Sequence, residues 1–268
     1  MVVGASDTGK STFAHWLLEQ LAARSSTPLA FLDGDPGQST LGPPTTITLA
    51  LARAGMVRFP GSGRRWRRFT GSTTPQNHVL PFLASVSRLV EVARSRKIRI
   101  IVYDTTGLID PNHGGVPLKL AKIDLLHPEF LIAIRRKDEL EPLLGPLRRS
   151  TRARIFELDP SPALQPRSMA ARQRHRARRF ARHFAGAALL EVDVSRFAVF
   201  PDDSPAPNQL LAFEDAAGFT LALGIAGRND KTANTASILT PIRSLSAVDA
   251  IRLADMTVDP ATFRDQML

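Results

Sequence analysis

The sequence predicts an α/β fold in which a parallel sheet carries helices on both faces, followed by a small β-rich C-terminal domain. Buried strands alternate with helical stretches from residue 1 to 144, and a glycine-rich loop joins the first strand to the first helix. Past residue 190, short alternating runs separated by turns replace the helices. We therefore expect one domain over residues 1–190, including an arginine-rich helix at about 168–184, and a second over 191–268.

The glycine-rich loop reads Gly4-Ala5-Ser6-Asp7-Thr8-Gly9-Lys10-Ser11 and is followed by Thr12. This is the G-x-x-x-x-G-K-S pattern of a P-loop, and the apolar spacing over residues 13–23 supplies the helix that must follow it. The two glycines let backbone N–H groups face one concavity at the helix N-terminus. Lys10 would reach the β- and γ-phosphates, and the Ser11 hydroxyl would join a Mg²⁺ shell. The loop predicts a P-loop NTPase fold but does not identify the phosphate acceptor.

Two carboxylates follow the second predicted strand, at residues 28–32, in the segment Asp33-Gly34-Asp35-Pro36-Gly37-Gln38-Ser39. Ligands bind at this edge of open α/β sheets. Because Asp33 and Asp35 are two residues apart, an extended backbone puts them on one face. One could orient Mg²⁺ and the other accept a proton from an attacking hydroxyl. An ordinary turn is the alternative, but a turn does not need two aspartates and a glutamine here.

The clearest buried strand covers residues 98–104 and ends in Asp104. An apolar strand that ends in Asp is the Walker B arrangement, which places a carboxylate near Mg²⁺. Thr105-Thr106-Gly107 follows, and its small side chains let the backbone approach the γ-phosphate. After the next strand, residues 135–139 lack the Asn/Thr-Lys-x-Asp motif that reads guanine in GTPases. A guanine-specific site is therefore not favoured.

Two other stretches could contact a substrate. The loop at 71–77 precedes a predicted helix, and its hydroxyls and amides could hold a hydroxyl-bearing end or simply cap that helix. Its candidate substrate contacts are Thr73, Thr74, Pro75 and Asn77. A predicted hairpin at 56–70 interleaves arginines with Trp66 and Phe69, a pattern that can bind single strands. Its alternation favours instead a solvated hairpin whose aromatic rings face the core.

Residues 170–184 predict a helix with many arginines and no acidic residue, so pairing within the helix cannot explain them. One face carries Arg172, Arg176, Arg179 and His183, and another carries Arg174, Arg178 and Arg182. A mobile arginine helix over a P-loop would neutralise charge on a transferring phosphoryl group. A surface helix or an RNA-docking helix is the alternative.

The charge distribution suits a polyanionic partner. The chain carries a net charge of +10, yet residues 191–268 hold 6 Lys+Arg against 11 Asp+Glu, while residues 1–190 hold 29 against 14. A basic P-loop half fits nucleic acid, although an arginine-rich proteome would give the same balance. The absence of cysteine excludes disulfides, thiolate catalysis and Cys-based zinc sites, and it fits a reducing cytosol.

We expect a cytoplasmic protein without a membrane partner. No apolar run approaches the ~20 residues of a membrane span, and the N-terminus has no signal-peptide pattern. Only three residues precede Gly4, fewer than a central strand usually has. A few natural residues are therefore expected to be missing before Met1.

Taken together, the motifs resemble those of the polynucleotide 5′-hydroxyl kinases. They are G-x-x-x-x-G-K-S at 4–11, D-G-D-P-G-Q at 33–38, T-G-S-T-T-P-Q-N at 70–77, D-T-T-G-L-I at 104–109, R-F-x-x-x-F at 179–184, and the pattern L-x-A-F-E-D-x-x-G-F-x-L-A-L-G-I at 210–225. The family includes the kinase subunit of the pre-mRNA 3′-end cleavage factor, the nucleolar pre-rRNA processing kinase, and shorter prokaryotic relatives. The similarity covers nearly the whole chain.

The resemblance implies transfer of the γ-phosphate of ATP, with Mg²⁺, to a 5′-hydroxyl end of RNA or DNA, and it allows for RNA-processing partner proteins. It assigns phosphate and Mg²⁺ binding to Lys10 and Ser11 with Thr12 in support, and the role of general base to Asp35. Asp33 and Gln38 would hold metal or substrate. Residues 73–77 would form a clasp at the acceptor end, and residues 105–107 a γ-phosphate sensor.

The resemblance leaves two points open. Its best register makes Arg172, Arg176 and Arg179 the lid arginines, but Arg174 and Arg178 fit nearly as well. Leu108 stands where eukaryotic members often have an aromatic residue, so the choice between RNA and DNA is undecided. An ATP-binding scaffold that has lost catalysis and a small-molecule kinase are the alternative functions. The retained P-loop, Asp35 and arginine helix argue against a scaffold.

Overall fold

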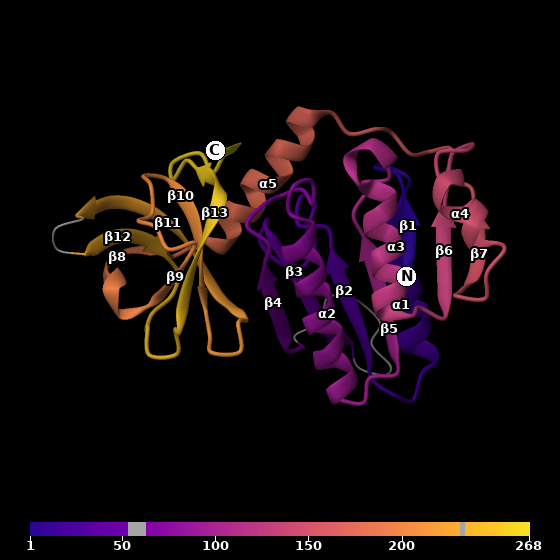
Figure 1. Ribbon diagram of the computed structural model, residues 1–268, viewed down its shortest axis with the longest axis horizontal. Coiled ribbons are helices and arrows are strands. Elements are labelled where there is room, and N and C mark those ends of the chain that lie inside the picture. The colour runs from indigo at the N-terminus through magenta and orange to yellow at the C-terminus, as the bar shows by residue number, and fades with distance from the viewer. Residues whose placement is uncertain (53–62, 231–233) are drawn as a thin grey trace. The chain divides into compact units, whose positions relative to one another are not determined.

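The computed structural model describes residues 1–52, 63–230 and 234–268, which form two compact units (Figure 1). The first unit comprises Met1–Asp35, Ile47–Arg65 and Thr74–Arg167, and the second comprises Pro36–Thr46, Trp66–Thr73 and Ser168–Leu268. These units divide the chain differently from the expected 1–190 and 191–268, because the arginine-rich helix and two earlier segments group with the C-terminal sheet. Residues 56–62 of the predicted hairpin, which include most of its tip, lie outside the described residues.

The first sheet has seven strands in the order β4-β3-β2-β5-β1-β6-β7. They are β1 (Val2–Gly4), β2 (Leu29–Gly34), β3 (Thr46–Ala52), β4 (Arg65–Phe69), β5 (Ile100–Thr105), β6 (Phe130–Ile134) and β7 (Arg154–Leu158). Strands β2, β5, β1, β6 and β7 pair in parallel, and β3 pairs antiparallel with β2. The predicted parallel sheet is confirmed, and β3 makes the complete sheet a mixed one.

Helices cover both faces of this sheet, as the alternating pattern predicted. They are α1 (Lys10–Arg24), α2 (Val79–Ser95), α3 (Gly115–Leu126) and α4 (Glu141–Leu147), with the short 3₁₀ helix η1 (Pro111–His113) before α3. Helix α1 packs on β1, β2 and β5, while α2 and α3 contact each other and lie side by side in Figure 1. Right-handed crossovers place α1 on one face of the sheet and α2, α3 and α4 on the other face. The reason is that the chain crosses the strand order in one direction through α1 and in the reverse direction through the other three helices.

The central strands are buried because both faces of the sheet are covered. All six residues of β2 are buried, and so are the last four of β5. Parallel strands buried in this way read as continuous apolar runs, which is why the sequence located them. Both strands carry an aspartate at their carboxyl ends, Asp33 and Asp104. The fold therefore delivers two carboxylates to one edge of the sheet.

The second unit is built on an antiparallel sheet with the path β14-β13-β10-β11-β12-β8, to which β9 adds in parallel beside β13. Its elements are α5 (Met169–His183), β8 (Ala188–Asp193), η2 (Val194–Arg196), β9 (Ala198–Phe200), β10 (Gln209–Glu214), β11 (Thr220–Asp230), β12 (Thr235–Thr240), β13 (Ala250–Val258) and β14 (Asp265–Met267). Alternate residues of β10 enter different core clusters: Leu210 packs with Phe180 of α5, and Leu211 packs in the other cluster. The predicted β-rich C-terminal region is confirmed.

The aromatic residues of the predicted hairpin face the core. Trp66 and Phe69 are 8% and 2% exposed. Phe69 packs with Phe180 of α5 and with Phe184, which directly follows that helix, inside the second unit. Their burial confirms that the rings face the core, and these two rings offer no stacking surface for bases.

Candidate active site

The P-loop is wound tightly between β1 and α1. Gly9 has a φ of 84°, a left-handed value that glycine adopts most easily. A Cβ on Gly4 would lie 2.7 Å from the Thr8 hydroxyl oxygen, so no larger residue fits without a shift. The Thr8 hydroxyl and the Lys10 ammonium both donate to the Ala5 carbonyl oxygen, at 3.0 and 2.5 Å. A closed loop at the N-terminus of a helix is the arrangement that anion binding requires.

The two strand-end carboxylates are neighbours in the sheet. Asp33 and Asp104 lie in register on β2 and β5, and each is 1% exposed. Burial, together with the charges of Asp33 and Asp35, raises the pKa of Asp104 to about 7, although a hydrogen bond from Ser11 and the charge of Lys10 oppose the shift. Among the described residues, Oδ1 of Asp104 is buried without a hydrogen-bond partner. Crowded, buried negative charge of this kind favours a cation.

The donor set is compatible with Mg²⁺. No group of three His, Asp or Glu side chains in the described part of the chain could form an all-protein metal cage. Mg²⁺ usually takes only one or two carboxylates and completes its octahedron with waters and substrate phosphates. The Ser11 hydroxyl and the Asp104 carboxylate, which share a hydrogen bond, are donors of this type, and Asp33 is the neighbouring carboxylate.

The segment after Asp104 approaches the P-loop closely. The Thr105 hydroxyl donates to the Val2 carbonyl oxygen at 2.8 Å, which ties the end of β5 to β1. A Cβ on Gly107 would lie 2.8 Å from the Ser6 nitrogen, so only glycine fits there without a shift. The structure thus brings together the P-loop, both aspartates and residues 105–107, which the sequence had linked only by motif.

Lys119 is a site residue that the motifs did not reveal. Its side chain is completely buried, and its ammonium donates to the Thr105 hydroxyl at 3.0 Å and to the Thr106 carbonyl oxygen at 2.6 Å. A buried charge needs such partners. Lys119 therefore holds the segment that faces the P-loop.

Lys122, one turn further along α3, is equally buried but differently placed. Its ammonium lies 5.4 and 5.7 Å from the ring centroids of Tyr103 and Phe82, and it has no hydrogen-bond partner among the described residues. Burial lowers its pKa to about 7. The signal that could have found both lysines is their position in α3, where the apolar periodicity calls for core residues.

Basic side chains also hold the apex of the P-loop. Arg136 donates to the Asp7 carbonyl oxygen at 2.5 Å, and the backbone N–H of Arg167 donates to the Asp7 carboxylate at 3.1 Å. Arg136 lies in the segment that lacks the guanine-reading motif, and no sequence pattern singled it out. Its contact gives that segment a different role, which is support of the loop.

The substrate role that we expect for the loop before α2 stays a prediction. Pro75 is buried, the Thr74 hydroxyl accepts from the Gln76 N–H at 3.3 Å, and Asn77 has a φ of 62°. Helix capping does not account for these residues, because the N-cap of α2 is His78 and makes no side-chain capping bond.

The remaining expected site residues belong to the second unit. They are Gln38, Thr73, Arg172, Arg176 and Arg179. Arg176 forms a largely buried ion pair with Asp265 at 2.9 Å, and Arg179 donates to the Gly42 carbonyl oxygen at 2.6 Å. Gln38 donates to the neighbouring Gly37 carbonyl oxygen at 2.6 Å. These contacts tie α5 to its own unit, and the lid role of the three arginines stays a prediction.

A family model decides the relationship of this chain to known proteins. The model described as mRNA cleavage and polyadenylation factor CLP1 P-loop matches residues 4–186. The chain belongs to the CLP1 P-loop family. The match runs from the P-loop through both strand-end aspartates to the arginine-rich helix, so the family resemblance seen in the motifs is confirmed.

Several curated proteins that are similar to this chain carry kinase names. The chain is 29% identical over 199 residues to the polyribonucleotide 5′-hydroxyl-kinase of Pyrococcus furiosus, covering 74% of this chain and 54% of that protein. It is 29% identical over 192 residues to the enzyme of the same name from Methanocaldococcus jannaschii, covering 72% and 52%. It is 26% identical over 183 residues to the polynucleotide 5′-hydroxyl-kinase GRC3 of Yarrowia lipolytica, covering 65% and 30%. The chain thus spans about half the length of the first two relatives.

Solved structures confirm the fold over almost the whole chain. A chain in the structure of the wild-type Clp1p–Pcf11p complex superposes with a TM-score of 0.70 at 13% identity, covering 96% of this chain and 73% of that one. A second Clp1p–Pcf11p structure gives 0.71 with similar coverage. Within the described ranges, no helix is long and apolar enough to cross a membrane.

Proposed function

We propose that the chain is an ATP- and Mg²⁺-dependent polynucleotide 5′-hydroxyl kinase. The observation that carries this proposal is the meeting of a wound P-loop with Asp33 and Asp104 at one sheet edge, in a chain of the CLP1 P-loop family. The kinase names of its relatives support the acceptor. The net charge of +10 suits a polynucleotide better than a small acceptor.

The residues of the first unit would divide the reaction between them. The 5′ oxygen attacks the γ-phosphorus, the bond from that phosphorus to the β–γ bridging oxygen breaks, and ADP leaves. Asp35, which follows the buried end of β2, would accept the hydroxyl proton as general base. Lys10 would neutralise charge on the β- and γ-phosphates, and residues 105–107, held by Lys119, would face the γ-phosphate.

Ser11, Asp104 and Asp33 would hold the metal. When bound, Mg²⁺ supplies charge neutralisation between the β- and γ-phosphate oxygens. The raised pKa of Asp104 supports this placement, because a carboxylate that is buried beside another one gains most from a cation. The structure of the Clp1p–Pcf11p complex supports the further proposal of an RNA-processing protein partner. The cytoplasmic location stays a prediction.

The proposal is tested by following the γ-phosphate itself. Labelled ATP and Mg²⁺ are supplied with matched RNA and DNA oligonucleotides that carry 5′-hydroxyl ends, and the labelled product is digested to nucleotides. The proposal predicts label on the 5′-terminal nucleotide, and the RNA to DNA ratio gives the acceptor preference. ATP binding without label on any oligonucleotide would point instead to the scaffold or to a small-molecule acceptor.

A further inference from the structure

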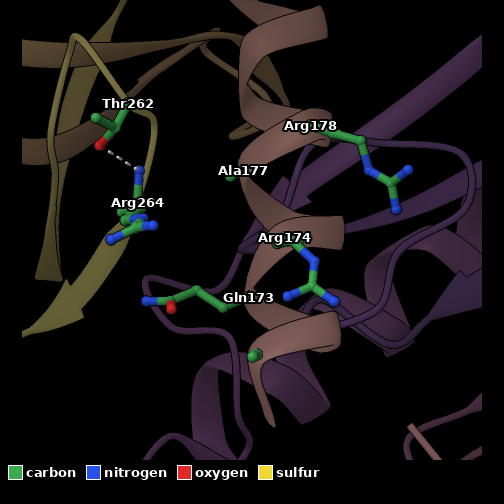
Figure 2. A pocket seen from close by; sticks show the side chains of 7 residues that line it. Gln173, Arg174, Ala177, Arg178, Thr262 and Arg264 are labelled. Atoms are coloured by element: carbon green, nitrogen blue, oxygen red, sulfur yellow. Dashed lines mark hydrogen bonds between the residues drawn. The ribbon is translucent and has the colours of Figure 1, made fainter. Parts of the chain in front are cut away.

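A basic groove lies on α5 within the second unit. Its volume is about 490 Å³, and its lining residues are Ala170, Gln173, Arg174, Ala177, Arg178, Thr262 and Arg264. Figure 2 shows Arg174 and Arg178 extending from one side of α5, with Gln173 and Arg264 on the other side and Ala177 between them. The lining therefore combines arginines on both sides of α5 with the small side chains of Ala170 and Ala177.

Three arginines and no acidic residue line the groove. Arg174 and Arg178 are exposed, and neither has a hydrogen bond or an ion pair to another residue within the described ranges. Their helix neighbour Arg176 is committed to Asp265, whose carboxylate is only 7% exposed. Asp265 is next to Arg264 in the sequence, and its carboxylate is engaged by Arg176. The arginines of α5 thus divide into some that the fold uses and others that face a groove.

Neighbouring acids do not neutralise this groove. Asp259, at the start of the turn that carries Thr262, accepts the backbone N–H groups of Ala261 and Thr262 at 2.7 and 3.2 Å. These bonds are the main reason that its pKa is lowered, and the charge of Arg264 contributes least. Asp259 is not a lining residue. The three guanidinium groups remain the dominant charge.

The chemistry of the lining matches a phosphodiester. Arginine presents a planar fork of donors that suits two phosphate oxygens, and two arginines one helical turn apart can serve neighbouring phosphates. Gln173 and Thr262 add uncharged donors, and the small alanine side chains leave room for a sugar. No aromatic side chain lines the groove, so it would contact the backbone and not stack on bases.

We propose that this groove is a subsite for the phosphodiester backbone of a single-stranded polynucleotide. This rests on the proposed polynucleotide kinase function, because it assigns part of the acceptor strand to the second unit. The subsite gives affinity without sequence preference, and its contribution weakens as salt rises. It also explains why α5 carries exposed arginines that have no hydrogen bond or ion pair within the described protein.

The test measures binding without catalysis. Fluorescence anisotropy follows a 3′-labelled 5′-hydroxyl RNA of about 12 nucleotides as salt increases, using the whole chain. The triple variant Arg174→Gln, Arg178→Gln, Arg264→Gln is expected to bind roughly 10- to 100-fold more weakly at low salt, with the salt slope reduced by about 0.7 for each phosphate that the variant no longer neutralises. The matched lysine triple variant keeps the charge and should recover most of the slope.

Arg196→Gln is the control, because Arg196 is exposed in the same unit and does not line the groove. If the triple glutamine variant folds and binds the RNA as tightly as Arg196→Gln does, the proposal is overturned. If affinity falls as expected but the wild-type chain transfers no phosphate to any oligonucleotide, the groove stands and the kinase function fails. If the wild-type chain transfers phosphate to the oligonucleotide but the triple glutamine variant binds RNA as tightly as the control, the kinase function stands and the groove proposal fails.

Discussion

Asp33 and Asp104 lie side by side in register on the adjacent parallel strands β2 and β5, both almost completely buried. Two carboxylates in this position repel each other, and water cannot screen them. Burial first, and Asp33 second, raise the pKa of Asp104 to about 7. The sheet edge thus stores unfavourable charge that a bound cation relieves, which ties stability to the proposed metal site.

Asp104→Asn should stabilise the protein in metal-free buffer at pH 8. The folded-state pKa of about 7 exceeds the ordinary value of 3.8, so the folded protein binds the extra proton between these values and loses stability as pH rises through 7. The amide removes that penalty, which is on the order of 4 kcal/mol. Urea unfolding of wild type and variant at pH 8 and at pH 4 measures the difference in their free energies of unfolding. A variant less stable than wild type at pH 8 would contradict the account.

The two buried lysines of α3 should respond oppositely to the same substitution. Lys119→Met removes the donor to Thr105 and Thr106 and leaves buried acceptors unpaired, which costs about 1–3 kcal/mol. Lys122→Met removes a buried charge that has no hydrogen-bond partner among the described residues, so its stability should be unchanged or higher. Thermal melts of both variants at one pH provide the comparison.

Lys122→Met is the matched control for Lys119→Met, because helix, burial and substitution are the same. We also expect Lys119→Met to lower the rate of phosphate transfer more than it weakens ATP binding, since it loosens residues 105–107. Equal destabilisation by both substitutions would show that burial alone, and not the contact with this segment, determines the effect.

His183 should make the protein less stable as pH falls from 6.5 to 4. Its Nε2 accepts the Leu223 N–H at 3.0 Å, and burial, together with the charge of Arg67, lowers its pKa from 6.5 to about 4. The unfolded chain takes up the proton first, so stability that is complete above pH 6.5 is lost on acidification, by on the order of 2 kcal/mol. His183→Gln keeps an acceptor without titrating. If the free energy of unfolding of wild type and of His183→Gln changes with pH in the same way, His183 is not the group responsible.

Asp35→Asn should abolish phosphate transfer while ATP still binds. The carboxylate is proposed to take the proton of the 5′-hydroxyl, and an amide cannot do so. Lys10 and Thr8 hold the P-loop through the Ala5 carbonyl oxygen, so nucleotide affinity should stay within about twofold, well under 1 kcal/mol. Single-turnover kinetics with an ATP titration separates the two quantities. Near wild-type turnover would remove Asp35 from the mechanism.

Local patterns predicted much of the fold. The short alternating runs expected past residue 190 include β10, and the buried run ending in Asp104 is β5, because apolar runs and turns are local signals. The antiparallel direction of β3 and the grouping of residues 36–46 with α5 were not predicted. Both depend on pairing between distant segments, which periodicity does not encode.

The site residues that belong to motifs of fixed spacing could be predicted from the sequence. The P-loop, Asp33 and Asp104 follow from motifs, and the structure places them at one sheet edge. Lys119 and Arg136 were missed because their roles come from acceptors 13 and 129 residues away in sequence. The position of Lys119 among core residues of α3 signals burial, but the contact partners themselves leave no spacing pattern in a single sequence.

The most direct test of the central claim compares two proteins on two RNAs. Wild type and Lys10→Met receive labelled ATP, Mg²⁺ and one RNA with either a 5′-hydroxyl or a 5′-phosphate. The account predicts label on the 5′-hydroxyl RNA only, and only with wild type, because Lys10 is needed at the phosphates and the hydroxyl is the acceptor. Equal labelling of both RNAs, or none despite measured ATP binding, would contradict it.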